Sequence, residues 1–90
     1  MNEQRILEEL LEILEANGVT IRHEPLGGGA GGLCVIKGQK IFFADTQSSS
    51  ADVAAVAAEA VRKAVDIEKV YIRPEIREFI ESNSTTGEQN

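Results

Sequence analysis

The stretch that decides the fold reads LCVIKGQKIFFAD, from Leu33 to Asp45. Two apolar runs flank the polar segment 37–40, and this pattern is typical of a β-hairpin. Gly38 in the first position of a two-residue turn favours type II′. The register that follows predicts these cross-strand pairs: Ile36 with Ile41, Cys34 with Phe43, Val35 with Phe42, and Leu33 with Ala44. Both faces of the hairpin are then apolar, so one must meet helices and the other must be covered by the chain or by a partner.

A strong helical pattern precedes the hairpin. Asn2 is a candidate N-cap and Asn17-Gly18 a C-terminal stop. The apolar stripe between them comprises Leu7, Leu10, Leu11 and Leu14, and it is widened by Ile6 and Ile13. A stripe this wide exceeds what one small sheet needs. We expect a helix packed across a sheet and flanked by a second helix, with a dimer contact as the alternative.

The other elements follow from periodicity and capping. Segment 19–23 alternates as a half-buried strand, and a second helix begins near Ser49 and runs to residue 64. Residues 70–72 read as a short extended segment or edge strand, and Pro74 opens a last short helix. The sequence therefore predicts an α+β fold: a small three- to four-stranded, mostly antiparallel sheet with two main helices and a short C-terminal helix. We expect one domain over residues 1–81 and a disordered tail over 82–90.

Composition narrows the function classes. The chain has 90 residues and a net charge of −6, and its nine Lys and Arg residues are scattered, which argues against nucleic-acid binding. Its single cysteine allows no intrachain disulfide. No signal peptide and no apolar run of membrane-spanning length are visible, so no membrane association is expected. These features predict a cytoplasmic protein.

The glycine run 27–32 has two interpretations. Backbone amides of glycine loops can cradle an anion, but phosphate loops open a helix and usually carry a lysine. This run opens a strand, so a flexible connector is favoured and a ligand loop is the alternative. The residues that would bind a ligand are His23, Gly28, Gly29, Gly31, Gly32 and Cys34.

Catalytic and metal chemistry find little support in the sequence. Cys34 and His23 could form a thiolate–imidazolium pair, but a thiol in the middle of an apolar strand is normally inert. One histidine and one cysteine fall short of the three or four ligands of zinc, even though Asp45 or Glu59 could add a carboxylate. We expect no catalytic residue, no metal and no cofactor, and lean against an enzyme.

Two resemblances rest on short motifs. Residues Gly31-Gly32-Leu33-Cys34, Lys37-Gly38, and Val70 to Pro74 with Arg77 resemble a group of small bacterial proteins without an assigned activity, over roughly residues 5–81. The order of hairpin, polar loop and helix is similar to that in compact antirepressor-cleaving zinc peptidases, whose helix carries HExxH. Here the matching segment, Ala58 to Arg62, keeps Glu59 and lacks both histidines, which implies a related scaffold without its metal.

The functional expectation is a non-enzymatic interaction or accessory module that contacts a protein, either another copy or a different chain. The residues expected to make the contact are Ile6, Ile13, Val35 and Phe42. The alternative is a ligand-binding or vestigial metallopeptidase-like domain that uses the glycine-rich loop with His23, Cys34 and Glu59.

Overall fold

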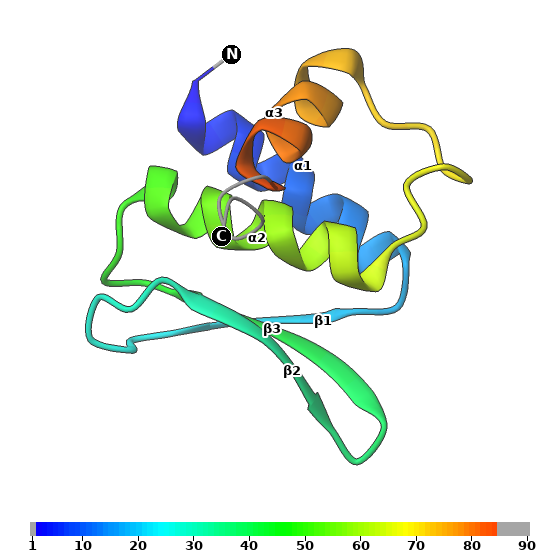
Figure 1. Ribbon diagram of the computed structural model, residues 1–90. Helices are drawn as coiled ribbons and strands as arrows, with labels where there is room; N and C mark the ends of the chain where they lie inside the picture. The colour runs from blue at the N-terminus through cyan, green and yellow to red at the C-terminus, as the bar shows by residue number, and fades with distance from the viewer. Residues whose placement is uncertain (1, 85–90) are drawn as a thin grey trace.

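Helices cover one face of the sheet in this computed structural model, which describes residues 2–84 (Figure 1). The elements within that range are α1 (Glu3–Ala16), β1 (Thr20–Glu24), β2 (Gly31–Ile36), β3 (Gln39–Asp45), α2 (Ser50–Ala64) and α3 (Pro74–Ser84). Helices α1 and α2 lie on the sheet, and α3 packs on α1 and α2 from the other side. The predicted α+β class is confirmed.

The predicted helix caps are confirmed. Asn2 Oδ1 accepts a hydrogen bond from the Arg5 amide at 2.8 Å, and Ser49 Oγ accepts one from the Asp52 amide at 3.1 Å. These bonds satisfy amides that the first turns of α1 and α2 leave without helical partners. Gly18, with φ of +91°, follows the C-cap Asn17 and redirects the chain into β1.

Strand β3 is the centre of the sheet, whose order is β1-β3-β2. It runs parallel to β1 and antiparallel to β2, so the sheet is mixed. Strands β1 and β2 are therefore the two edges. Their separation matters for the candidate site, because residues on β1 and β2 have β3 between them.

The predicted hairpin register is wrong by two residues. The turn consists of Lys37 and Gly38, with φ of +53° and +80°, which is the type I′ pattern and not type II′. The observed pairs are Ile36 with Gln39, Val35 with Lys40, Cys34 with Ile41, and Leu33 with Phe42. Side chains alternate with period two, so a shift of two leaves every residue on its predicted face.

The core lies between the sheet and the helices. Its largest fully buried side chains are Phe42, Leu10, Leu14, Ile76, Ile80 and Val61. Ile6 and Ile13 are partly buried and pack against this core, so contacts of α1 with the sheet, α2 and α3 account for the wide stripe. Phe42 is 0% exposed and offers no surface to a partner, contrary to its expected role in an interface.

Segment 70–72 forms no strand with the described sheet. It links α2 to α3 across the helical layer, where Ile72 is buried and Tyr71 is exposed. Helix α3 continues to Ser84, so the predicted domain boundary after residue 81 falls inside a helix. The rest of the predicted tail, residues 85–90, lies outside the described residues.

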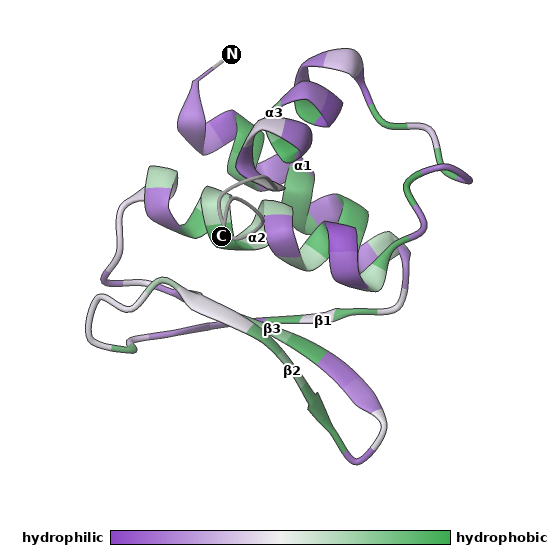
Figure 2. Ribbon diagram, viewed as in Figure 1, coloured by the Kyte–Doolittle hydropathy of each residue, from purple (hydrophilic) through white to green (hydrophobic). Residues whose placement is uncertain are grey.

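The hairpin projects beyond the helices. Figure 2 shows the end of β2 as a hydrophobic segment outside the helical layer. Val35 lies on the same face as Leu33 and Phe42, yet its side chain is 64% exposed. On the opposite face of the sheet the Arg22 guanidinium lies over the Phe43 ring, 5.7 Å from the centroid, and covers part of that face.

Candidate functional site

Asp45 is the buried charged side chain of the described chain, and it organises the glycine-rich loop. It ends β3 and is 3% exposed. Its carboxylate accepts hydrogen bonds from the backbone amides of Leu26 at 2.8 Å, Gly28 at 2.6 Å and Ala30 at 3.3 Å. Alternate amides of the loop therefore converge on one carboxylate. The anion that the loop amides bind is therefore the side chain of Asp45.

The loop backbone is shaped for this convergence. Gly27, Gly28, Ala30 and Gly31 all have positive φ, between +67° and +98°. Where residues of positive and negative φ adjoin, as at Gly28, Gly29 and Ala30, successive backbone N–H groups can point toward one centre, which is how concave anion sites are built from main chain. The glycines are thus an ordered part of the fold, and the favoured interpretation as a flexible connector does not describe them.

The segment after Asp45 completes the cluster. The Gln47 amide and the Ser48 hydroxyl donate to the Asp45 carboxylate at 2.9 and 2.8 Å. Gln47 Oε1 accepts from the Gly27 amide at 2.6 Å, and Ser48 Oγ accepts from the Ala30 amide at 2.9 Å. Four amides of the loop thus have acceptors within the chain and are not available to a phosphate.

Hydrogen bonding sets the ionisation of Asp45. Burial raises the pKa of this carboxyl, but donors from Leu26, Gln47, Ser48 and Gly28 outweigh burial and hold the pKa well below its ordinary value of 3.8. Asp45 is therefore an anion in the folded chain at neutral pH. The sequence suggests Asp45 only as a possible metal ligand; the signal for its structural role is the spacing Asp-x-x-Ser at 45–48.

His23 and Cys34 are not brought together. His23 lies on β1 opposite Ala44, on the helix side, whereas Cys34 lies on β2 opposite Ile41, on the other side. Strand β3 separates them, so they form no thiolate–imidazolium pair. Cys34 is exposed with a free thiol. Within residues 2–84 no three His, Cys, Asp or Glu side chains are gathered closely enough to hold a metal ion.

A hollow of about 360 Å³ lies beside His23 at the carboxyl ends of β1 and β3. Its lining combines apolar side chains of α1 and α2 with polar groups: Leu7, Leu11 and Val53 with Gln4, His23 and Ser50. Ser50 Oγ donates to Gln4 Oε1 at 2.6 Å across its rim. The histidine thus faces a cavity that is lined by Asp45 and Ser48, which hold the glycine loop, but by no glycine of that loop.

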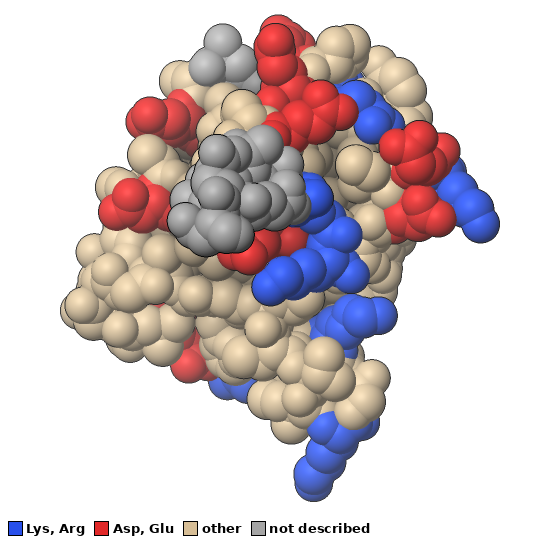
Figure 3. Space-filling view, viewed as in Figure 1, with Lys and Arg blue, Asp and Glu red and all other residues tan. Residues whose placement is uncertain are grey.

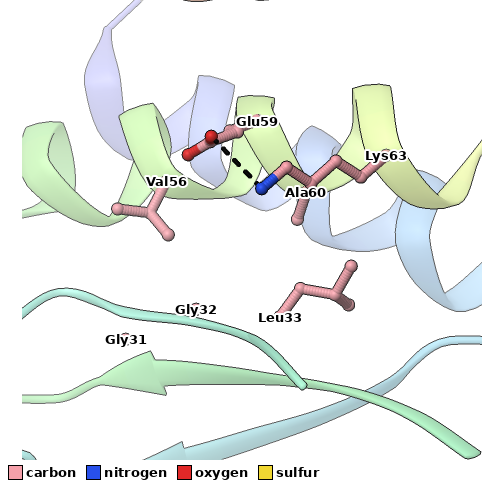
Figure 4. A pocket seen from close by; sticks show the side chains of 7 residues that line it. All are labelled: Gly31, Gly32, Leu33, Val56, Glu59, Ala60 and Lys63. Carbon is pink, nitrogen blue, oxygen red and sulfur yellow. Dashed lines mark ion pairs between the residues drawn. The ribbon is translucent and has the colours of Figure 1, made fainter. Parts of the chain in front are cut away.

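A second hollow lies between edge strand β2 and helix α2 (Figure 4). Its volume is about 340 Å³, and its lining comprises Gly31, Gly32, Leu33, Val56, Glu59, Ala60 and Lys63. Gly31 and Gly32 have no side chains to fill it. Glu59 and Lys63 form an ion pair of 3.4 Å on its helical wall.

A third hollow of about 280 Å³ lies on the opposite face of the same strand. Its lining is apolar and comprises Leu26, Gly31, Gly32, Cys34 and Phe43. Glycines 31 and 32 therefore leave space on both sides of β2. The predicted ligand residues Gly31, Gly32 and Cys34 meet here, whereas Gly28 and Gly29 belong to the Asp45 loop and His23 lies elsewhere.

The outer edge of β2 is open in the described chain. Ile36 and Gln39 flank the two-residue turn and form a hydrogen-bonded pair, so hydrogen bonding to β3 alternates along β2. The amides and carbonyls of Gly31, Leu33 and Val35 consequently point away from β3. Strand β2 carries no charge and no proline, the usual protection of an edge.

Exposed apolar side chains concentrate at this edge. In the described part of the chain the large exposed hydrophobic residues are Leu26, Val35, Ile36 and Tyr71, and the first three border β2. Figure 3 shows the hairpin as mostly uncharged surface, with basic side chains toward its tip. Among residues 2–84, large exposed apolar side chains thus gather mainly around β2.

The arginines at positions 73 and 77 make structural contacts. Arg73 pairs with Glu9 of α1 at 2.8 Å and with Glu75 at 3.1 Å. Arg77 donates to the Ile67 carbonyl at 2.7 Å. These bonds connect the start of α3 to α1 and to the preceding loop. Both arginines therefore have structural partners within the chain.

None of the helices in residues 2–84 is long and apolar enough to span a bilayer. Comparison of the chain with protein-family models, with curated proteins and with solved structures gives no significant match.

Proposed function

We propose that this chain is a small cytoplasmic, non-enzymatic interaction module that binds a partner protein by adding a strand to β2. The single observation that carries the proposal is the open edge of β2, free of charge and proline and bordered by exposed apolar side chains. In strand addition, main-chain hydrogen bonds give affinity and pockets for alternate side chains give specificity.

The surroundings of β2 fit this mode of binding. Outward amides and carbonyls at Gly31, Leu33 and Val35 supply the hydrogen-bonding row. The hollows on the two faces of β2 accept side chains that alternate above and below an added strand. Peptidase chemistry has less support: Ala58, at the first histidine position of the zinc-peptidase pattern, is fully buried and cannot present a ligand to the hollow.

A proline at position 35 tests strand addition directly. Val35→Pro removes one outward amide and leaves the hydrogen bonds between β2 and β3 intact, because proline is tolerated where an edge N–H faces solvent. Val35→Thr is the matched control, since it keeps the amide and the branched shape. Both variants should retain the fold because Val35 is largely exposed.

The readout is cross-linking in cells through a photoreactive side chain at position 36, which is 47% exposed. We expect a protein adduct of defined mass in the parent and in Val35→Thr, and about a tenfold loss in Val35→Pro. An adduct that survives Val35→Pro would contradict strand addition, and the absence of any adduct would contradict the interaction.

A second candidate is binding of a small ligand in the hollow beside His23, favoured by its mixed polar and apolar lining. A thermal-shift screen of nucleotides, phosphates and divalent metals tests it. A ligand at a hundredfold excess over its dissociation constant adds about 2.7 kcal/mol of stability. We expect that gain to disappear in His23→Ala; no stabilisation by any of these compounds removes this candidate.

A further inference from the structure

We infer that the partner on β2 is a second copy of this chain, paired antiparallel about a twofold axis at Leu33. This inference rests on the proposed strand addition. Pairing of the two β2 strands joins two three-stranded sheets into one sheet of six strands. Both helical layers lie on the same side of that sheet, because the twofold axis of an antiparallel pair is perpendicular to the sheet.

The hydrogen-bonding pattern selects the register. Antiparallel pairing requires residues whose amides and carbonyls point outward, and in β2 these are Gly31, Leu33 and Val35. An axis at Leu33 places Leu33 opposite its own copy and Val35 opposite Gly31, so the strands overlap over their length. An axis at Cys34 would pair Leu33 with Val35 but place Gly31 opposite Lys37, and an axis at Val35 would pair Leu33 with Lys37; both shorten the overlap, because Lys37 lies in the turn.

The shapes on the helix side are complementary in this register. Val35 shares the helix-side face of β2 with Leu33, but the helices do not reach it and it stays 64% exposed. Opposite it in the second copy is Gly31, beside the hollow of about 340 Å³. Val35 of each copy thus enters the space that the glycines of the other copy leave open.

The opposite face shows the same relation. There Cys34 of one copy lies opposite Gly32 of the other. Gly32 borders the apolar hollow that includes Leu26 and Phe43. The exposed side chains of Cys34 and Val35 thus each meet a glycine, whereas Ile36 lies opposite Ala30, and the match is reciprocal by symmetry.

The charges near the axis also suit a second copy. Glu59 and Lys63 line the hollow above Leu33 and are each more than half exposed (Figure 4). A twofold axis at Leu33 sets the two α2 helices antiparallel, so Lys63 of one copy approaches Glu59 of the other. Strand β2 itself is uncharged, so the net charge of −6 on each copy does not oppose this contact locally.

Disulfide trapping tests the register, in a Cys34→Ser background that removes the native thiol. Leu33→Cys places two thiols across the axis at a Cα separation of about 5.5 Å, within the range of a disulfide. Val35→Cys is the control, because two copies of residue 35 are offset by four residues, or about 14 Å. We expect a covalent dimer from Leu33→Cys under mild oxidation and none from Val35→Cys.

Sedimentation equilibrium is the second measurement, and it does not depend on the folding of Leu33→Cys. The parent chain and Val35→Thr should reach twice the 9.7 kDa chain mass across a micromolar to millimolar series, and Val35→Pro should dimerise only at concentrations about tenfold higher or more. An unchanged dimerisation midpoint in Val35→Pro, or trapping at residue 35 instead of 33, would overturn the inference.

The two proposals fail differently. The parent chain could stay monomeric throughout the concentration series while the adduct in cells still requires the amide of residue 35. That result would overturn the inference of a second copy and would support strand addition by a different protein. Loss of both the dimer and the adduct would remove the proposed function as well.

Discussion

Gly31→Ala should strongly destabilise the folded state, whereas Gly32→Ala should leave its stability nearly unchanged. A Cβ on Gly31 would lie 1.8 Å from the carbonyl oxygen of Phe43 and 2.8 Å from its carbonyl carbon. Both atoms belong to the backbone of the central strand, so relief requires β2 to separate from β3. The φ of +98° at Gly31 adds strain for any L-side chain.

The expected loss for Gly31→Ala is about 4 kcal/mol or more, a large part of the stability of a domain this size. Gly32 is the matched control because no atom lies within 4 Å of its added Cβ and its φ is not positive. We expect a change within about 0.5 kcal/mol there. Urea unfolding followed by circular dichroism, at a dilution that keeps the chain monomeric, measures both. Near-equal midpoints for the two variants would contradict the close contact at Gly31.

Asp45→Asn should produce the second large effect, a destabilised chain that loses its acid sensitivity. The substitution replaces a carboxylate that accepts five hydrogen bonds by a group with one acceptor oxygen. The loop amides that face Oδ2 would then meet an NH₂ group or lose their acceptor. Unpaired buried donors are costly, so the loop and the start of β2 should loosen together.

The pH dependence has a defined sign. The pKa of Asp45 is lowered in the folded chain, so on acidification the unfolded chain takes up this proton first. The contribution of Asp45 to the free energy of unfolding is therefore complete above its ordinary pKa of 3.8 and is lost progressively as the pH falls below it. Asp45→Asn should flatten this part of the stability curve.

Asp52→Asn is the control, because Asp52 is an exposed carboxylate in the first turn of α2. Thermal unfolding between pH 7 and pH 2 should give parallel curves for this variant and the parent, and a shallower, lower curve for Asp45→Asn. An Asp45→Asn curve parallel to that of the parent would show that the loop does not depend on the charge.

Local patterns predicted the elements but not the connections between them. The caps at Asn2 and Ser49 and the apolar stripe of α1 are short-range features, and the structure confirms them. The predicted hairpin register is wrong because Lys37 adopts positive φ, a conformation that is not expected for a lysine. The extent of helical cover also escaped prediction: Phe42 lies under the helices, and Val35 on the same face lies beyond them.

The Asp45 cluster could not be predicted from the glycine run alone. The Asp45 carboxylate lies 19 residues after Leu26 and 17 residues after Gly28 in the sequence. The hairpin between them brings Asp45 next to the glycine loop. The separation of His23 from Cys34 depends on the insertion of β3 between two edge strands, which no local periodicity reveals. The hollow between β2 and α2 likewise depends on where α2 crosses the sheet.

Hydrogen exchange at the outward amides of β2, measured as a function of protein concentration, is a direct test of the pairing of β2 with a second copy. We expect the amides of Leu33 and Val35 to exchange freely in dilute solution and to become protected as the concentration rises. The Cys34 amide, bonded to β3, should be protected throughout. Leu33 and Val35 amides that exchange freely at every concentration would contradict the pairing of β2 with a second copy.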